Sequence, residues 1–233
     1  MTIVNENIVF RLLKPSSPSS SIEQCKSLVI DNFLKYGSLE RELRRTYSEE
    51  KIRSFLSGYV NNLVEASIPY EISVYALDKV TNQVVGVFLN GNCELEEFEM
   101  EYTGDPIIPF LEELDNSYFQ NRLNNGQYFH GVMVAVHPDF SRRGIFKNLC
   151  LLSFQVALSK KFEFFIAECS SPYTFGTLTK FGATIEASSK YSEFEFKGSR
   201  PFRDLEGTCC LVQLDKHQLE AALKQNQLPH IEE

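Results

Sequence analysis

The sequence predicts an α/β fold in which a mixed, mostly antiparallel and twisted sheet of about seven strands carries helices on both faces. Short apolar and β-branched runs alternate with longer stretches whose apolar residues recur every three or four positions. The resulting order is β, α, α, β, β, α, β, α, β, α, β, β, which is typical of a mixed sheet covered by helices. With 233 residues and 43% hydrophobic content, one substantial core is expected. We therefore predict a single domain over residues 1–233, with its core at about 7–215 and a polar tail at 216–233.

The chain begins with a predicted strand and a predicted helix. Ile8 to Leu13 is the strand, and the serine-rich turn at residues 15–21 offers N-caps for a helix from about Ile22 to Tyr36. Gly37 ends this helix.

A second helix and a hairpin are predicted next. Thr46 and Glu49 have the spacing of a capping box, and the apolar residues after them repeat at three and four until Pro69. Two strands follow, Glu71 to Leu77 and Gln83 to Gly91, joined by a short polar turn that makes a hairpin.

An acidic run and a third helix precede the middle of the chain. Glu94 to Glu101 contains five glutamates, which form either a solvated edge or a negative rim that attracts a protonated amine. Pro106 begins a predicted helix that reaches about Leu123.

Tyr128 to Leu152 predicts a buried strand, a tight turn and a helix. The apolar strand ends at His137-Pro138, and the apolar residues from Ile145 onward lie on one face of a helix. The first turn of a helix has amide groups without intrahelical partners, so a turn carrying Arg142, Arg143 and Gly144 can bind an anion such as a phosphate. The alternative is a packing unit with a solvated basic turn.

These residues also carry a family resemblance. The stretch from Val134 to Leu149, VAVHPDFSRRGIFKNL, resembles the acetyl-CoA-binding motif of the GNAT superfamily of N-acetyltransferases. The match holds at the strand, the proline, the loop arginines, Gly144 and the helix leucine. It departs at Ser141, where glutamine or arginine is usual, and at Phe146, where glycine or alanine is usual. The Phe146 ring either crowds the pyrophosphate or turns inward to the core.

The resemblance implies acetyl-CoA as co-substrate and a set of residues that bind it. Unpaired backbone amides of the motif strand would hold the pantetheine arm and the thioester oxygen, and the turn with the helix start would hold the pyrophosphate. The implied residues are Val134, Ala135, Val136, Arg142, Arg143, Gly144, Ile145, Phe146 and Lys147.

The last third completes the sheet. The predicted elements are an apolar strand at Phe162 to Ala167, a helix that ends at Phe181-Gly182, strands near Thr184 to Phe196 and Thr208 to Leu214, and a terminal helix with a frayed end from Lys216. Glu168 to Thr174 and the stretches after it resemble the C-terminal half of the invertebrate arylalkylamine N-acetyltransferases, and residues 33–39 resemble their front.

This second resemblance implies catalytic residues. The glutamate that those enzymes use as a base falls on Gly37, and Glu40 replaces it only if the backbone differs. Their loop serines map onto Ser170 and Thr174. His130 lies where the vertebrate arylalkylamine enzymes carry a catalytic histidine.

The chemistry requires a base, because an amine with pKa near 10 must lose a proton before it attacks a thioester. Histidine, with an ordinary pKa of about 6.5, suits this role, so His130 is the first candidate; the alternative is a strand histidine with no catalytic role. The tyrosine that many GNAT enzymes use as an acid corresponds to Leu178. Tyr173, Thr174 or solvent would then serve, or a thiolate with pKa near 8.5 leaves unprotonated.

The net charge and the cysteine pattern limit which classes of partner and cofactor are expected. The net charge of −8 argues against nucleic acid and anionic membranes and favours a cationic small molecule. The six cysteines lack C-x-x-C spacing, and no histidine or carboxylate cluster has metal-ligand spacing, so we expect reduced thiols and no metal. The start has no secretory pattern and no long apolar run occurs, so a cytoplasmic protein is expected, as a monomer or weak homodimer.

Three functional hypotheses follow. The first is an acetyl-CoA-dependent N-acetyltransferase acting on small primary amines, arylalkylamines by resemblance, through direct attack in a ternary complex. The second is a non-catalytic acyl-CoA-binding module, and the third is an enzyme of the same fold that modifies a protein or polyamine.

Overall fold

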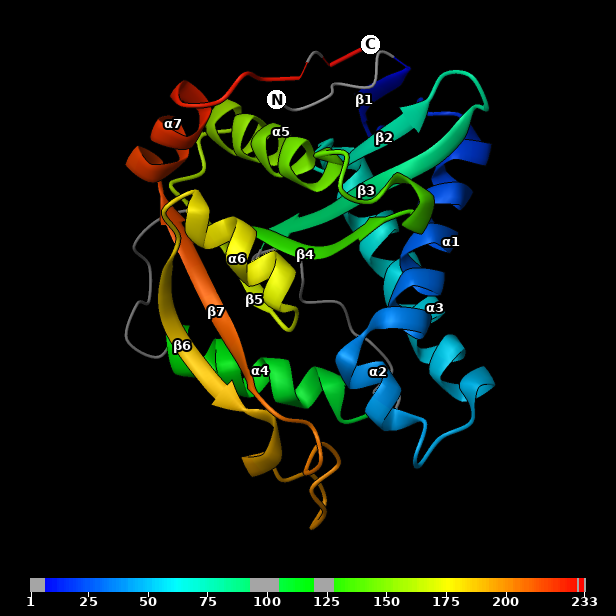
Figure 1. The fold of residues 1–233 in the computed structure, drawn as a ribbon, viewed down its shortest axis with the longest axis vertical. Coiled ribbons are helices and arrows are strands. Elements are labelled where there is room, and N and C mark those ends of the chain that lie inside the picture. Colours follow the sequence, from blue (N-terminus) through cyan, green and yellow to red (C-terminus); the bar gives the residue numbers. More distant parts are fainter. Residues whose placement is uncertain (1–6, 93–104, 120–127, 230, 233) are drawn as a thin grey trace.

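Seven strands form one twisted sheet in the computed structural model, which describes residues 7–92, 105–119, 128–229 and 231–232 (Figure 1). The strands are β1 (Ile8–Leu12), β2 (Val74–Asp78), β3 (Gln83–Asn92), β4 (Tyr128–Val136), β5 (Phe164–Cys169), β6 (Thr184–Lys190) and β7 (Thr208–Asp215). They lie in the order β1-β2-β3-β4-β5-β7-β6. Only β4 and β5 are parallel, and every other neighbouring pair is antiparallel. The predicted fold class is therefore confirmed.

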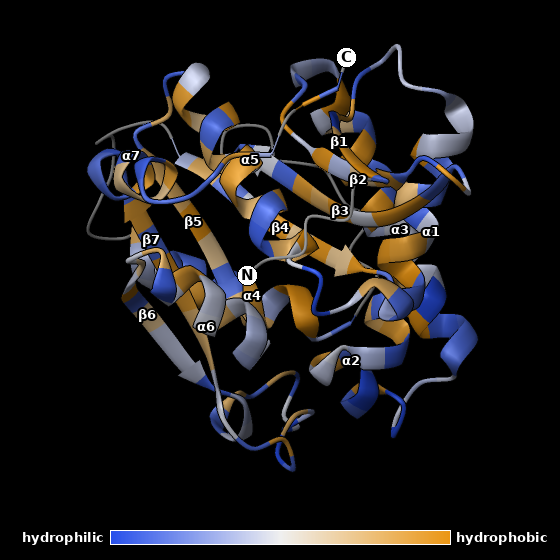
Figure 2. Ribbon diagram, turned by 45° about the horizontal axis from the view of Figure 1, so that its top comes forward, coloured by the Kyte–Doolittle hydropathy of each residue, from blue (hydrophilic) through white to orange (hydrophobic). Residues whose placement is uncertain are grey.

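Helices cover both faces of this sheet. They are α1 (Ser19–Tyr36), α2 (Ser38–Leu43), α3 (Glu49–Ser67), α4 (Ile107–Phe119), α5 (Ile145–Ser159), α6 (Pro172–Lys180) and α7 (Lys216–Lys224). One hydrophobic core lies between the sheet and α1, α3 and α4, and a second lies between the sheet and α5, α6 and α7. Figure 2 shows β4 hydrophobic along most of its length, whereas β6 at the sheet edge is paler. The central strands are thus buried by both layers of helices, which is why they are apolar on both sides.

Most predicted elements are found with small shifts, but the strand predicted to reach Phe196 ends at Lys190, where a short 3-10 helix follows, and one helix was missed. The sequence gives no signal for α2, because six residues make less than two turns and show no full apolar stripe. The capping box predicted at Thr46 and Glu49 is wrong. The N-cap of α3 is Ser48, whose side chain accepts a hydrogen bond of 3.2 Å from the Lys51 amide. The acidic run at Glu94 to Glu101 and the predicted helix end near Leu123 lie outside the described residues.

The C-terminal tail packs on the body of the protein. Asp215 and Gln218 form a capping box at the start of α7, and Leu219 of this helix is fully buried. Farther on, the Glu232 carboxylate lies 2.8 Å from the Arg11 guanidinium and 2.6 Å from the Lys79 ammonium. The end that the sequence predicted to fray is therefore held against β1. Within the described residues, no helix combines the length and the apolar character needed to cross a bilayer.

The sheet opens between its two central strands. β4 pairs with β5 at three positions, Tyr128 with Phe164, Phe129 with Phe165 and His130 with Ile166. The register between β3 and β4 shifts at Val132, which has no opposite residue on β3. A bulge bends a strand locally. Beyond His130, β4 therefore runs with one edge unpaired by any described strand.

Candidate active site

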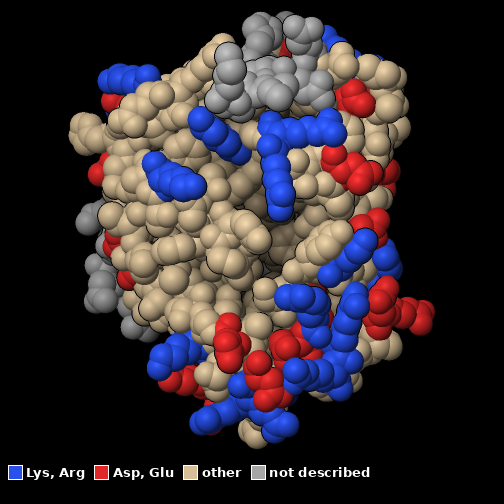
Figure 3. Space-filling view, in the orientation of Figure 1, with Lys and Arg blue, Asp and Glu red and all other residues tan. Residues whose placement is uncertain are grey.

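A cavity of about 1510 Å³ lies at the open edge of β4. It is enclosed by α1, α2, α3 and α4 on one side and by β4, β5 and the start of α6 on the other. Figure 3 shows this face of the molecule hollowed at its centre, with basic side chains above the hollow near α5. Five carboxyl groups line the described walls, against one arginine and one histidine: Glu40, Asp105, Glu112, Asp115 and Glu168, with Arg41 and His130. Aromatic residues line it too, so the cavity suits a ligand that combines a positive charge with an apolar body.

The backbone of β4 presents peptide groups to this cavity. The His137 amide donates to the Val85 carbonyl at 2.9 Å, and hydrogen bonding alternates along an antiparallel pair. Ala135 therefore turns its peptide groups towards Val87 of β3, whereas Val134 and Val136 turn theirs towards the open edge. The Val136 carbonyl accepts a hydrogen bond of 3.2 Å from the Asn32 side chain of α1. The Val134 amide is thus the donor in the middle of the open edge.

The turn between β4 and α5 has the backbone of an anion site. Arg142 and Gly144 both have left-handed φ angles, 60° and 76°, which curve the chain just before the helix. The first-turn amides of α5, at Ile145, Phe146 and Lys147, have no intrahelical acceptors. A phosphate placed there meets aimed donors and the positive end of the helix dipole.

The side chains of this turn lie in different environments. The Phe146 ring packs against Phe88 of β3, with ring centroids 6.3 Å apart, and is partly buried. Of the two orientations considered for Phe146, it adopts the inward one. Arg143 donates to the Asp139 carbonyl at 3.0 Å and lies over the Phe140 ring, 4.7 Å from its centroid. Arg142 is exposed beside it.

His130 and Glu168 form a buried hydrogen-bonded pair. The His130 Nε2 atom lies 2.6 Å from Glu168 Oε2, and both side chains are 7% exposed. Burial by itself raises the pKa of the Glu168 carboxyl, but the charge and hydrogen bond of His130, together with a hydrogen bond from Asp115, outweigh it and lower that pKa. The sequence reasoning missed Glu168 as a site residue. The available signal was one charged residue within the apolar strand FFIAEC, placed two residues beyond the partner of His130.

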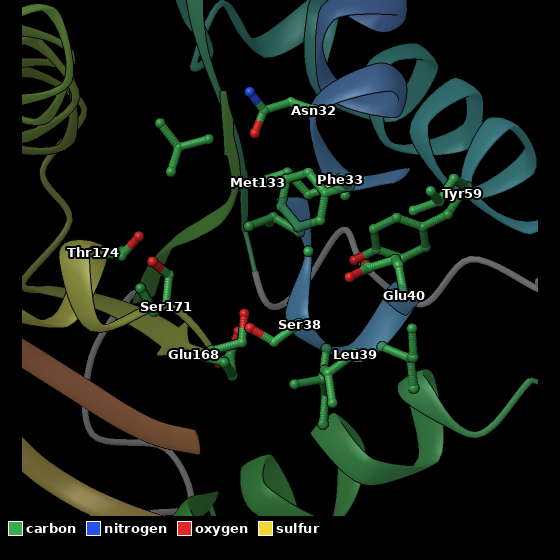
Figure 4. A pocket seen from close by; sticks show the side chains of 18 of the residues that line it. Asn32, Phe33, Ser38, Leu39, Glu40, Tyr59, Met133, Glu168, Ser171 and Thr174 are labelled. Atoms are coloured by element: carbon green, nitrogen blue, oxygen red, sulfur yellow. The ribbon is translucent and has the colours of Figure 1, made fainter. Parts of the chain in front are cut away.

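Glu40 is a second buried carboxyl group in the same cavity. It is 5% exposed, and burial raises its pKa to about 7, with the charge of nearby Asp105 adding to the effect. Its carboxyl lies against Gly37, where a Cβ atom would collide with Glu40 Oε2 and come within 2.6 Å of the Phe33 carbonyl. In Figure 4, Glu40 of α2 and Tyr59 of α3 point toward one another. The missing side chain at position 37 therefore leaves the space that the Glu40 carboxyl occupies.

The loop between β5 and α6, together with the first turn of α6, brings residues with hydroxyl groups to the rim. Ser170 and Thr174 both line the cavity, and the Ser170 carbonyl accepts a hydrogen bond of 3.2 Å from the Tyr191 hydroxyl. Ser171 caps α6 by accepting from the Tyr173 amide at 3.3 Å. Figure 4 shows Ser171 and Thr174 side by side.

The position of the family's acid and the residue named as its substitute differ in exposure. Leu178 is fully buried in the second core, so α6 carries no acid there. Tyr173 is 85% exposed at the cavity rim.

Comparison with known proteins finds similarity in structure alone. No family model matches the sequence, and no curated protein sequence matches it. Among solved structures, the C-terminal condensation domain of Ebony in complex with β-alanyl-dopamine has a TM-score of 0.73 at 19% identity, over 89% of this chain and 98% of that one. Arylalkylamine N-acetyltransferase 2 from Aedes aegypti has a TM-score of 0.69 at 16% identity, over 90% and 99%.

Two further structures extend this picture. A polyamine N-acetyltransferase from Drosophila melanogaster, which forms N-acetylagmatine, has a TM-score of 0.68 at 14% identity, over 89% of this chain and 99% of that one. The NatC complex bound to Gag peptide and CoA has a TM-score of 0.52 at 14% identity, over 90% and 98%.

Proposed function

Because the chain has the GNAT fold, we propose that it is an acetyl-CoA-dependent N-acetyltransferase that acts on a small primary amine by direct attack in a ternary complex. One observation carries the proposal: a single cavity joins the open edge of β4 to the buried, titratable carboxyl of Glu40. The structural neighbours named for arylalkylamines and for agmatine support a small amine.

We assign the donor to the side of the cavity formed by β4 and α5. The pyrophosphate of CoA would lie against the amides of residues 145–147 with Arg142 and Arg143 supplying charge, and Gly144 lets the backbone approach closely. The pantetheine arm would follow the open edge and accept hydrogen bonds from the peptide groups of Val134 and Val136. The Val134 amide is also our candidate donor to the thioester oxygen as negative charge develops there.

We assign the base to Glu40. A carboxyl group with pKa about 7 is partly ionised at neutral pH and is matched to proton transfer near that pH. His130 is the second candidate. Its Nε2 atom is held by Glu168, so only its Nδ1 atom could take the proton of the amine. For this reason Glu40 ranks before His130.

Ser170 and Thr174 are proposed to act at the reacting centre. Their hydroxyl groups line the cavity beside the open strand edge, where they can hydrogen-bond the amine or a water that relays its proton. The proposal also places the reaction in the cytoplasm, on a monomer or weak homodimer.

The second candidate function is a non-catalytic acyl-CoA-binding module. Leu178 favours it, because this fully buried residue removes the acid that many enzymes of this fold provide from α6. A thiolate with pKa near 8.5 can leave without that acid, so the enzyme ranks first.

Release of free CoA thiol across a panel of small amines tests the proposal. We expect thiol release with at least one amine, and a loss of about 10²-fold or more in kcat/KM for Glu40→Gln. His130→Ala would show the same loss only if the histidine is the base. Thermal stabilisation by CoA without thiol release from any amine would establish the binding module, and absence of both would refute the acyl-transfer function.

A further inference from the structure

The proposed reaction leaves one feature of the cavity unused. Glu168 is nine-tenths buried, and only its Oε2 atom is bonded to His130. Among the residues that the structure describes, no donor reaches its Oε1 atom. A buried carboxylate oxygen without a donor costs free energy unless a ligand supplies one.

A second carboxyl group lies beside Glu168. Asp115 of α4 is close enough for its carboxyl, when protonated, to hydrogen-bond the Glu168 carboxylate, and that bond contributes to the lowered Glu168 pKa. With both acids ionised and His130 protonated, the three groups carry a net charge of −1. A proton on Asp115 would balance this charge, and a bound cation could take the place of that proton.

Glu168 and Asp115 lie apart from Glu40, the proposed base. In Figure 4, Glu168 of β5 and Glu40 of α2 lie at opposite sides of the cavity, and Glu168 points toward Ser38. The two carboxyls also differ in their titration, since the pKa of Glu40 is raised and that of Glu168 is lowered. A carboxyl that stays ionised is a poor base and a good partner for a permanent positive charge.

We infer that Glu168 and Asp115 form a recognition site for a second ammonium group, in addition to the amine that is acylated. This inference rests on the proposed acyl transfer and narrows its substrates. The ammonium is carried either by the acceptor, as in a diamine, or by the acyl group of the donor, as in an aminoacyl thioester. Glu168 lines the same cavity as Val134 of the proposed donor side and Glu40 of the proposed acceptor side. With a simple acetyl group and a monoamine, only a proton on Asp115 would compensate the Glu168 carboxylate at this place.

Two isosteric ligand pairs test this inference. The acceptor arm compares putrescine with pentylamine, using acetyl-CoA as donor. The donor arm compares β-alanyl-CoA with butyryl-CoA, using one monoamine as acceptor. In each pair an ammonium replaces a methyl group, so the ratio of kcat/KM values isolates the second charge. We expect a ratio of about 10² or more in one arm, because a site built to hydrogen-bond a group rejects the analogue that lacks it.

Variants show whether Glu168 produces that ratio. Glu168→Gln keeps the shape and removes the charge, so the ratio should fall to about one. Asp115→Asn removes the charge beside Glu168, so it should also lower the ratio of kcat/KM values. This variant provides the test if Glu168→Gln folds poorly. Glu113→Gln, at an exposed position of the same helix outside the cavity lining, is the matched control and should retain the ratio.

Ratios near one in both arms of the wild-type protein would overturn the inference, as would a high ratio that persists in Glu168→Gln. In either case, thiol release with pentylamine or with butyryl-CoA would leave the acyl-transfer function intact. If no pair releases thiol, the same ratios are measured as dissociation constants by calorimetry with putrescine, pentylamine and the two thioesters. Equal dissociation constants within each pair would then refute the ammonium site independently of catalysis.

Discussion

At position 37 the chain has a glycine, and the carboxyl group in the adjoining space comes from Glu40, three residues later. The resemblance to arylalkylamine enzymes placed a base at position 37, and the sequence alone left Glu40 dependent on the backbone. The structure provides that backbone, because α1 ends at Tyr36 and α2 begins at Ser38. The turn between these helices directs Glu40 into the cavity.

The raised pKa of Glu40 predicts a pH dependence of stability. In the folded protein this pKa is about 7, against an ordinary value of 4.5, so the folded state keeps a proton that the unfolded chain releases between these values. Stability therefore falls as the pH rises from about 4.5 to 7, by on the order of 3 kcal/mol. Glu40→Gln removes this loss. In urea unfolding, we expect its stability relative to wild type to increase from pH 5 to pH 8.

Glu65→Gln is the control for this measurement, since Glu65 is an exposed residue of α3. Its difference from wild type should not vary with pH. A difference between Glu40→Gln and wild type that is equal at pH 5 and pH 8 would contradict the raised pKa.

Gly37→Ala should lower kcat/KM by displacing the Glu40 carboxyl. The added Cβ collides with Glu40 Oε2, and we expect a loss of about 10²-fold, similar to that of Glu40→Gln. Combined with Glu40→Gln, the alanine should cost little further activity, because its effect passes through the missing carboxylate. Steady-state kinetics of the three variants measure this coupling.

Gly176→Ala is the matched control, because a Cβ atom there meets nothing within 4 Å. It should keep full activity and gain about 0.5–1 kcal/mol of stability, as alanine does in a helix. Additive losses in the double variant at position 37 and position 40 would indicate a backbone effect at the Phe33 carbonyl instead.

At the scale of single residues, several of the candidates named from the sequence lie around one cavity. His130, Ser170 and Thr174 line it, together with Val134 and Phe146. The Glu168 partner of His130 was missed because pairing across two parallel strands depends on their register, which no local pattern encodes. The inward turn of Phe146 was left open, since only its packing on Phe88 decides it.

At the scale of elements, long periodic segments were predicted well and short ones were not. The helices α1, α3 and α5 have apolar stripes over 15 or more residues, which fixes their type. α2 is held by buried Leu39 and Leu43, so its stability comes from tertiary contacts. Thr46 competed with Ser48 as a cap, and two plausible caps two residues apart are not distinguished by spacing alone.

The start of α5 predicts a test that concerns donor binding. Arg142→Ala should raise KM for acetyl-CoA by about 10-fold to 100-fold with kcat little changed, because a hydrogen bond to a charged group contributes about 1.5–3 kcal/mol. The effect should disappear with the acetyl thioester of N-acetylcysteamine, which has no pyrophosphate. Kinetics with both donors provide the comparison.

Lys180→Ala, at the exposed end of α6, is the control and should leave both KM values unchanged. An equal loss of Arg142→Ala with the truncated donor would remove the pyrophosphate from this turn.

At the scale of the whole molecule, the C-terminal tail joins the second core to the sheet edge. α7 packs on α5. The Glu232 amide donates a hydrogen bond of 2.9 Å to the Phe10 carbonyl, and the Glu232 carboxylate forms two ion pairs. The polar composition of this tail predicted a frayed end. These contacts are long-range, and those of Glu232 join residues more than 150 positions apart, so composition could not reveal them.

Leu219→Ala should destabilise the whole protein. The side chain is fully buried in the second core, and removing it leaves a cavity that costs about 2–5 kcal/mol. Urea unfolding followed by circular dichroism measures the change. Leu228→Ala, at a position 39% exposed, should change stability by less than about 0.5 kcal/mol. Equal stability of the two variants would show that α7 is not part of the cooperative fold.

The short join between β4 and β5 has a consequence for the order of events. Three residue pairs connect one half of the sheet, β1 to β4, with the other half, β5 to β7. With so few pairs, a ligand in the gap beside them would contact both halves and help to fix the angle between them. A thioester arm bound there would form part of the amine-binding site. The acyl donor would therefore bind first and the amine second.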